Sequence, residues 1–283
     1  MDAWGPARAD DLATLLAAAL PGESISVDEL LACCWDDPTG AVLGDVDGNA
    51  AVSLVTRSIG DDSHAFVVAL AVAPVAQGDG RGRRLLDAAV AWAGDHGCRH
   101  LHVGGSAPFY LWPGVDTRWT RAICLFESAG FARVGAEVNM SCVSTFRAPA
   151  PDGVAVARVV ADADAEAVRD FCVEHFAHWG PEVARAVEQG GCFFARRSAD
   201  GDVIGFACHS VSRAGWLGPM ATHPSRRHAG VGAALVSAVC ADVADMGRPD
   251  VEIAWVGPVG FYARSAGAAV SRVFLRMSSR IGR

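Results

Sequence analysis

Hydrophobic positions along the chain follow two alternating periods, and the order of these periods occurs twice. Apolar residues three and four positions apart predict helices at 10–20, 27–35, 163–176 and 181–189. Short apolar runs that predict strands follow each pair of helices, at 41–46, 50–56, 192–197 and 203–210. The pattern therefore predicts two copies of one layout of helices and strands.

A longer segment repeats with an offset of 150 residues. The first copy, AFVVALAVAPVAQGDGRGRRLLDAAVAWA, begins at Ala65, and the second, GWLGPMATHPSRRHAGVGAALVSAVCADV, begins at Gly215. Both read as an apolar strand, a proline, a short polar loop with glycines, and a helix. An aromatic residue followed by glycine recurs later, as Phe126 with Gly130 and Tyr262 with Gly267.

Each copy continues with a short strand and ends on a longer apolar strand. These four predicted strands are 100–103 and 131–143 in the first copy and 250–255 and 268–277 in the second. Alternating prolines at 147–153 interrupt the pattern, because proline cannot sustain a helix or a central strand. We therefore expect an N-terminal domain at 1–147, a linker at 148–153 and a C-terminal domain at 154–283. The fold class is α/β (α+β), with a mixed, mostly antiparallel sheet flanked by helices in each domain.

Length and charge agree with two domains and narrow the possible partners. The 283 residues suffice for two hydrophobic cores. The net charge of −8 disfavours binding to nucleic acid. The longest apolar run, 66–76, is too short to cross a bilayer, and the first residues do not resemble a signal peptide. The sequence thus predicts a cytoplasmic protein that acts without a membrane.

The nine cysteines are scattered and form no CxxC or Cys/His cluster. Most lie in apolar runs, where a free thiol packs as a small hydrophobic group. We expect neither a metal site nor a disulfide.

The repeated glycine loops are the chemical signal of this sequence. A helix N-terminus presents N–H groups without intrahelical acceptors and a partial positive charge, and glycine lets a pyrophosphate approach that backbone. A P-loop would need a lysine, and the chain has none. The dinucleotide fingerprint, with its acidic residue about twenty positions on, does not fit either copy.

The loops and their flanking strands resemble motif A of the GNAT superfamily of N-acetyltransferases. The first copy reads Val72-x-Pro74-x-x-Gln77-x-x-Gly80-x-Gly82, and the second reads Thr222-x-Pro224-x-x-Arg227-x-x-Gly230-x-Gly232. Phe261-Tyr262 with Gly267 resembles the later aromatic element of that family. The resemblance covers nearly the whole chain as two tandem domains.

This resemblance implies a coenzyme A site in each domain. The backbone of one strand meets the pantetheine arm, and the loop N–H groups meet the phosphates. In the first domain the implied residues are Leu70, Val72, Gln77, Gly78, Gly80 and Gly82. In the second they are Met220, Thr222, Arg227, His228, Ala229, Gly230, Val231 and Gly232.

The two copies differ at positions that matter for catalysis. By resemblance, Tyr262 protonates the leaving thiolate, whereas its counterpart Phe126 has no proton to give. Asp79 places a carboxylate in the first anion loop, and Gln77 stands there in place of arginine. We therefore expect the C-terminal domain to be catalytic and the first to be a degenerate copy that still binds cofactor.

Two further features have both a functional and a structural interpretation. Glu252, on the strand beside the cofactor strand, either relays a proton from the amine or is an ordinary outward-facing carboxylate. Glu174, His175 and His178 either form a cationic-amine subsite or end a solvated helix.

The preferred function is transfer of an acetyl or other short acyl group from acetyl-CoA to a primary amine. The amine attacks directly, without an acyl-enzyme, and a small-molecule acceptor is favoured over a protein. The alternative is a non-catalytic protein that binds or senses acyl-CoA. The acceptor and the oligomeric state do not follow from the sequence.

Overall fold

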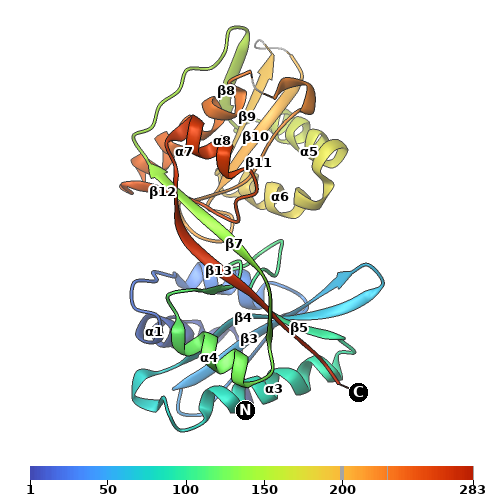
Figure 1. Ribbon diagram of the computed structural model, residues 1–283. Helices are drawn as coiled ribbons and strands as arrows, with labels where there is room; N and C mark the ends of the chain where they lie inside the picture. Colours follow the sequence, from blue (N-terminus) through green and yellow to red (C-terminus); the bar gives the residue numbers. More distant parts are fainter. Residues whose placement is uncertain (198–200, 228, 283) are drawn as a thin grey trace. The chain divides into compact units, whose positions relative to one another are not determined.

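The computed structural model describes residues 1–197, 201–227 and 229–282, and the chain forms two compact units (Figure 1). Unit 1 comprises Met1–Glu137 together with Val273–Arg283, and unit 2 comprises Val138–Arg272. The sequence-based expectation of a mixed, mostly antiparallel sheet flanked by helices is confirmed for each unit.

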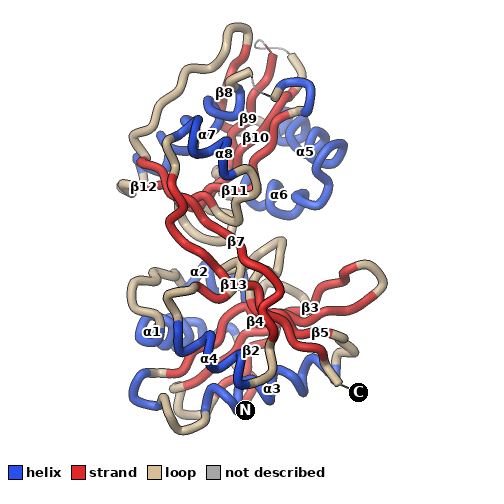
Figure 2. Tube along the Cα trace, viewed as in Figure 1, coloured by secondary structure: helices blue, strands red, loops and turns tan. Residues whose placement is uncertain are grey.

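Unit 1 has its strands in the order β1-β2-β3-β4-β5-β13, with β6 also paired to β13. The strands are β1 (Asp2–Ala3), β2 (Ala41–Gly44), β3 (Ala50–Ile59), β4 (Asp62–Val72), β5 (His100–Val103), β6 (Val115–Asp116) and the end of β13 (Ala269–Arg280). The helices are α1 (Ala9–Ala19), α2 (Val27–Leu30), α3 (Arg81–Asp95) and α4 (Thr120–Ser128). Short helical turns are η1 (Pro6–Arg8), η2 (Leu31–Trp35) and η3 (Pro74–Ala76). Figure 2 shows β3 and β4 as a long hairpin.

Unit 2 repeats this arrangement in the order β8-β9-β10-β11-β12-β7. Its strands are the end of β7 (Ala132–Val143), β8 (Val154–Arg158), β9 (Cys192–Arg197), β10 (Val203–His209), β11 (Trp216–Thr222) and β12 (Asp250–Ile253). The helices are α5 (Asp162–Phe176), α6 (Gly180–Glu188), α7 (Val231–Asp245) and α8 (Val259–Ala266), with short turns η4 (Ala177–Trp179) and η5 (Pro224–Arg226).

The sheet of unit 2 is covered on both faces. Ala207 belongs to the core that α7 and α8 form with the sheet, which includes Leu235 and Tyr262. Phe206, its neighbour on β10, points to the opposite face and contacts Phe171 of α5. Figure 1 accordingly shows α5 and α6 on one side of this sheet and α7 and α8 on the other.

Each unit takes its last strand from the other half of the sequence. After α4 of unit 1, β7 continues into unit 2, where Met140 pairs with Ile253 of β12. After α8 of unit 2, β13 continues into unit 1, where Met277 pairs with Val103 of β5.

The compact units therefore differ from the sequence-based division at 1–147 and 154–283, which follows the order of the chain. The apolar patterns of 131–143 and 268–277 predict two strands, but a strand pattern does not specify its partner.

In the part of the chain that the structure describes, no helix combines the length and the apolar character needed to cross a membrane.

Candidate active site

A separation of two parallel strands is present in both units. In unit 2, β11 pairs with β12 at Trp216–Glu252 and Leu217–Ile253, and β11 then runs on to Thr222. In unit 1, β4 pairs with β5 as far as Val67–Val103 and then runs on to Val72. The two separations are 150 residues apart, which matches the offset of the sequence repeat.

A β-bulge lies at each point of separation. The register of β11 against β10 shifts between Met220–Ala207 and Leu217–His209, so β11 carries an extra residue there. The register of β4 against β3 shifts in the same way between Ala69 and Val67. Bulges of this kind bend a strand and redirect its backbone groups.

Beyond each bulge, alternate residues point their backbone N–H and C=O groups toward the open side, which is the side where the parallel neighbour strand no longer pairs. The N–H of His223 donates to the carbonyl of Ile204 on β10. N–H and C=O groups alternate in direction along a strand. Met220 and Thr222 therefore point theirs away from β10, toward the side on which β12 no longer pairs with β11.

In unit 1 the same alternation holds. Ala73 donates its N–H to the carbonyl of Asn49, next to β3, so Leu70 and Val72 face away from β3. The four residues predicted from the sequence therefore lie at the strand separations, two in each unit.

The glycine loop of unit 2 ends at the N-terminus of α7. Gly230 is the N-cap, with φ of 82°, in the left-handed region that favours glycine. The first intrahelical bond joins the N–H of Ala234 to the carbonyl of Gly230, at 3.1 Å. The preceding N–H groups, from Val231 to Ala233, are those that an α-helix leaves for a cap or ligand.

Of the described residues around this loop, one has a buried side chain and three are exposed. Val231 is buried in the core of unit 2, so its side chain points away from solvent. Arg227, Ala229 and Gly230 are exposed. His228 lies outside the described residues.

The glycine loop of unit 1 also ends at a left-handed N-cap glycine, and its side chains make contacts of their own. Gly78 and Gly80 have φ of 94° and 76°, and Gly80 is the N-cap of α3. The Gln77 side-chain amide donates to the Val72 carbonyl at 3.0 Å, and its oxygen accepts from the Arg121 guanidinium. The Gln77 side chain thus bonds to the Val72 carbonyl, which points away from β3 toward the open side of β4. The side chain of Asp79 is exposed.

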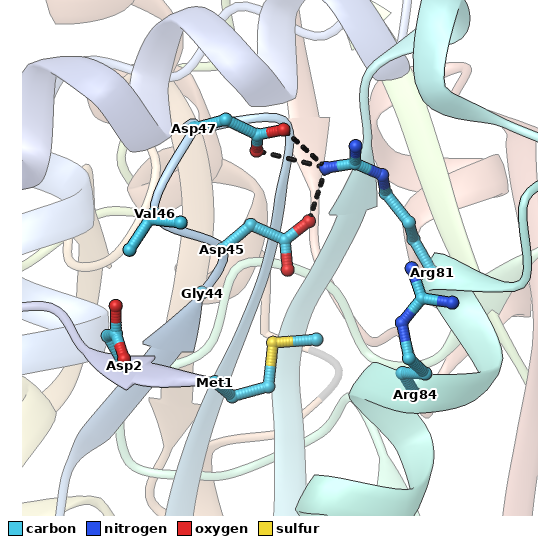
Figure 3. A pocket seen from close by; sticks show the side chains of 8 residues that line it. All are labelled: Met1, Asp2, Gly44, Asp45, Val46, Asp47, Arg81 and Arg84. Carbon is cyan, nitrogen blue, oxygen red and sulfur yellow. Dashed lines mark hydrogen bonds and ion pairs between the residues drawn. The ribbon is translucent and has the colours of Figure 1, made fainter.

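Arg81, the first residue of α3, is paired within the protein. Its guanidinium donates to Asp45 at 2.6 Å and to Asp47 at 2.8 Å (Figure 3). The hydrogen bonds from Arg81 and Asn49 lower the pKa of Asp47 to about 2. These groups line a cavity of about 340 Å³ together with Met1, Asp2, Gly44, Val46 and Arg84. The carboxylates of Asp45 and Asp47 thus hold the Arg81 charge within the protein.

Contacts at two glycines define which residues of α4 and α8 are equivalent. A Cβ at Gly232 would lie 2.8 Å from the ring of Phe261, and a Cβ at Gly82 would lie 2.9 Å from Leu125. Leu125 and Phe261 therefore occupy the same place. The next residue is Phe126 in unit 1 and Tyr262 in unit 2, which supports the alignment of the sequence repeat.

Tyr262 is buried in the core of unit 2 beside residues of β7, including Met140 and Cys142. Burial raises the pKa of Tyr262, so its phenol keeps its proton at neutral pH. Phe126 is buried as well, and its ring meets Phe131 edge to face at 5.3 Å.

Glu252 lies on β12 at the last pairs before the strands separate. Its Oε1 accepts from the amide of Asn139 and lies 3.8 Å from the guanidinium of Arg272. Asn139 in turn accepts from the N–H of Trp255, which has φ of 48°. Glu252 thus holds the loop after β12 in place, and both contacts use one carboxylate oxygen.

Within the Glu174 cluster, the Nε2 of His175 lies 3.7 Å from a carboxylate oxygen of Glu174. The side chain of Glu174 is 73% exposed, and His178 is exposed. The ring of His175 also lies 4.8 Å from that of His223, edge to face, at the start of the glycine loop. The helix end therefore contacts the loop through one histidine.

One buried carboxyl, Glu182 of α6, does not stand out in the sequence. An acidic residue in the first turn of a helix is common and is usually solvated, so its type carries little signal. In the structure it is only 7% exposed, and burial raises its pKa to about 8.

Comparison with known proteins gives a family and a fold. The model of the acetyltransferase (GNAT) family matches residues 10–110 and 158–267, more than half of the chain. No curated protein matches the sequence.

Solved structures share the fold at low sequence identity. A GCN5-related glucosamine N-acetyltransferase region of a fungal multi-domain GH3 β-N-acetylglucosaminidase is 17% identical, with a TM-score of 0.78 over 98% of this chain. This chain spans only 38% of that fungal protein.

Two further structures match over nearly their whole length. A tandem GNAT protein from the clavulanic acid biosynthesis pathway is 16% identical, with a TM-score of 0.74, and the match covers 99% of this chain and 98% of the other. A GCN5-related N-acetyltransferase from Sphaerobacter thermophilus is 20% identical, with a TM-score of 0.68 and coverage of 99% and 95%. With the family model matched once in each half of the sequence, the chain belongs to the acetyltransferase (GNAT) family as a tandem member.

Proposed function

We propose that unit 2 binds acetyl-coenzyme A and transfers its acetyl group to a primary amine of a small molecule. The observation that carries the proposal is the separation of β11 from β12 after Leu217. Beyond it, the backbone of Met220 and Thr222 faces an open side that leads to the N-terminus of α7. An extended pantetheine arm matches the first feature, and phosphates match the second.

The residues present fit this cofactor. Left-handed glycine at the N-cap keeps a side chain away from the N–H groups of α7, and Arg227 is exposed beside them. Gly230, Val231 and Gly232 would supply backbone donors, with Ala229 and His228 in the same loop. In unit 1, Leu70, Val72 and the loop from Gln77 to Gly82 would form a weaker site, because Gln77 occupies the Val72 carbonyl.

Tyr262 and Glu252 would carry the two proton transfers of this reaction. Acetyl-coenzyme A supplies an acetyl thioester, whose carbonyl carbon the amine attacks. A C–N bond forms, the C–S bond breaks, the amine loses a proton and the thiolate gains one. Tyr262 holds a proton at its buried phenol oxygen and would donate it to the sulfur. Glu252 would accept the amine proton through a water, on its second carboxylate oxygen.

A second candidate function rests on unit 1. Phe126 stands in the position of Tyr262 and has no hydroxyl, so unit 1 lacks the proposed acid. A protein that binds or senses acyl-coenzyme A without transferring the acyl group would need no such acid. We assign this role to unit 1, and for the whole chain it is the alternative to acetyl transfer.

One experiment separates the two functions. Calorimetry with coenzyme A measures binding, and thiol release from acetyl-coenzyme A with a panel of primary amines, glucosamine among them, measures transfer. Transfer requires amine-dependent thiol release together with an acetylated amine seen by mass spectrometry. Binding without amine-dependent release would establish the non-catalytic alternative. Absence of binding would overturn both.

A further inference from the structure

The chain turns away from β11 at Trp255, the second residue after β12. The N–H of Ala254 still donates to the carbonyl of Leu217 on β11, at 3.1 Å. Trp255 then has φ of 48°, in the left-handed region. A bulky residue keeps this conformation only where its surroundings hold it there. The separation of the two strands therefore begins at a residue whose backbone needs support.

Unit 1 makes the same turn with glycine. The N–H of Gly104 donates to the carbonyl of Val67 at 2.9 Å, and Gly105 then has φ of 70°. Gly105 and Trp255 are related by the 150-residue offset of the sequence repeat. Glycine takes the left-handed conformation without strain. The turn thus belongs to both strand separations, and in unit 2 a tryptophan makes it.

Asn139 of β7 supplies support to the backbone of Trp255. Its side-chain oxygen accepts from the N–H of Trp255 at 2.9 Å. At the equivalent point of unit 1, the N–H of Gly105 donates to the backbone carbonyl of Trp112 at 2.8 Å. A side chain in unit 2 therefore takes the part that a backbone carbonyl takes in unit 1.

The nitrogen of the same amide reaches Glu252. It donates to Oε1 of Glu252, and the guanidinium of Arg272 lies 3.8 Å from that oxygen. The Asn139 side chain is buried, so its two polar atoms depend on protein partners. A reversed amide would place its NH2 group against the N–H of Trp255, so the two partners together fix its orientation. The Glu252 side chain remains 23% exposed, which leaves the carboxylate accessible to water.

We propose that Asn139 is a positioning residue of the unit 2 site, which holds the strand separation open at Trp255 and orients the carboxylate of Glu252. This inference rests on the proposed acetyl transfer, in which Glu252 accepts the amine proton through a water. One amide then fixes the cofactor opening and the proton acceptor relative to each other. Asn139 lies between the two segments that match the family model, 10–110 and 158–267, so the match does not include it.

Two substitutions separate the two hydrogen bonds. Asn139→Asp keeps an oxygen for the N–H of Trp255 and removes the donor to Glu252, whereas Asn139→Ala removes both. In Asn139→Asp we expect an unchanged Kd for coenzyme A. The acid limb of the kcat profile should move up by about one pH unit, because neighbouring carboxylates disfavour each other's ionisation. Arg272 on β13 faces this pair and is present in both proteins. A merely structural role would lower kcat by the same factor at every pH.

The contact with Trp255 is tested without turnover. In Asn139→Ala, hydrogen exchange at the Trp255 amide should become about tenfold faster or more, because its N–H loses the acceptor. Coenzyme A should bind to unit 2 about tenfold more weakly, because the strain of a left-handed tryptophan is then unsupported. Adding Trp255→Gly should restore most of this affinity, since glycine needs no support. Trp255→Gly alone completes the double-mutant cycle and accounts for loss of the indole. Asn49→Ala in unit 1 is the control and should change neither readout.

Each part of the proposal has a result that overturns it. Unchanged exchange at Trp255 in Asn139→Ala, or no gain in affinity from the added Trp255→Gly, overturns the role at the strand separation. An unmoved acid limb in Asn139→Asp overturns the role at Glu252. If Asn139→Ala does not fold, recovery of folding with Trp255→Gly is the same rescue. If wild-type protein neither binds coenzyme A nor releases thiol, the proposed function fails, and exchange at Trp255 still decides on Asn139.

Discussion

The ring of Phe261 packs directly against Gly232, so that a Cβ at residue 232 would lie 2.8 Å from it. This contact lets α7 and α8 approach closely, and it places the next residue, Tyr262, in the core of unit 2. The glycine of the second loop thus has a packing role as well as its role at the start of the helix.

Replacing Gly232 by alanine should therefore destabilise unit 2. The added methyl forces α8 or the Phe261 side chain to move, and overpacking of this kind costs about 1–3 kcal/mol. Chemical denaturation measures the loss. Gly82→Ala meets the side chain of Leu125 at 2.9 Å and tests the equivalent contact in unit 1. Unchanged stability of the Gly232 variant would mean that this contact is not close in solution.

Replacing Gly230 by valine should abolish coenzyme A binding to unit 2. A β-branched residue is strained at φ of 82° and would place methyl groups beside the N–H groups of α7. Calorimetry should show the loss of the tighter of two binding events. Gly80→Val in unit 1 is the matched variant and should remove only the weaker event. If Gly80→Val removes the tighter event, unit 1 is the main cofactor site.

Tyr262→Phe should lower kcat by roughly 10²-fold while the Kd for coenzyme A stays constant. The thiolate that leaves has a pKa of about 8.5, and general acid assistance typically contributes about 10²–10⁴-fold. The variant removes one oxygen from a buried ring and leaves its packing in place. Phe126→Tyr in unit 1 is the companion variant and should leave kcat unchanged. A Tyr262→Phe protein with full kcat would show that the ring serves packing only.

Glu182→Gln should stabilise the protein above pH 8 and have little effect near pH 4. The folded state holds the Glu182 proton more tightly than the unfolded state, because burial raises the pKa from about 4.3 to about 8. The free energy of unfolding is therefore unaffected by this carboxyl below its pKa in the unfolded state. It decreases as the pH rises from that value to the pKa of Glu182 in the folded state. The ionisable groups that face this carboxyl, the thiols of Cys172 and Cys208, also have raised pKa values and stay neutral over this range.

Thermal unfolding as a function of pH measures this difference. The wild-type protein should lose about 1.4 kcal/mol of its free energy of unfolding per pH unit over this range. The total is a few kcal/mol, which corresponds to several degrees in Tm. Glu188→Gln, at an exposed position on the same helix, should follow the wild-type curve. Parallel curves for Glu182→Gln and wild type would mean that Glu182 is solvated or paired in solution.

Deleting residues 273–283 should weaken unit 1, although these residues come last in the sequence. They provide the β13 strand that pairs with β5 from His100 to Val103. Hydrogen exchange should show faster exchange at these β5 amides, while β12 keeps its protection because β7 still pairs with it. Loss of protection at β12 instead would place residues 273–283 in unit 2.

The sequence by itself determined the repeated elements and the residue types at the two loops. The periodicity marks strand, loop, glycines and helix at a 150-residue offset, and the structure has them there because local geometry requires glycine at Gly80 and Gly230. The difference between Phe126 and Tyr262 is likewise visible in the sequence.

Only the tertiary structure decided which strands pair and which polar groups are buried. Met140 and Met277 lie in similar apolar patterns, yet each pairs in the unit that the other half of the sequence mainly forms. The partner of a strand depends on the path that the chain takes through the folded protein. The glutamate at position 182 looks like a solvated first-turn residue, and Gln77 looks like a substitute for arginine. Burial sets the pKa of Glu182, and a hydrogen bond to the Val72 carbonyl engages the Gln77 side chain. Both effects arise from neighbours distant in the sequence or from the turn of the loop, which hydrophobic periodicity does not encode.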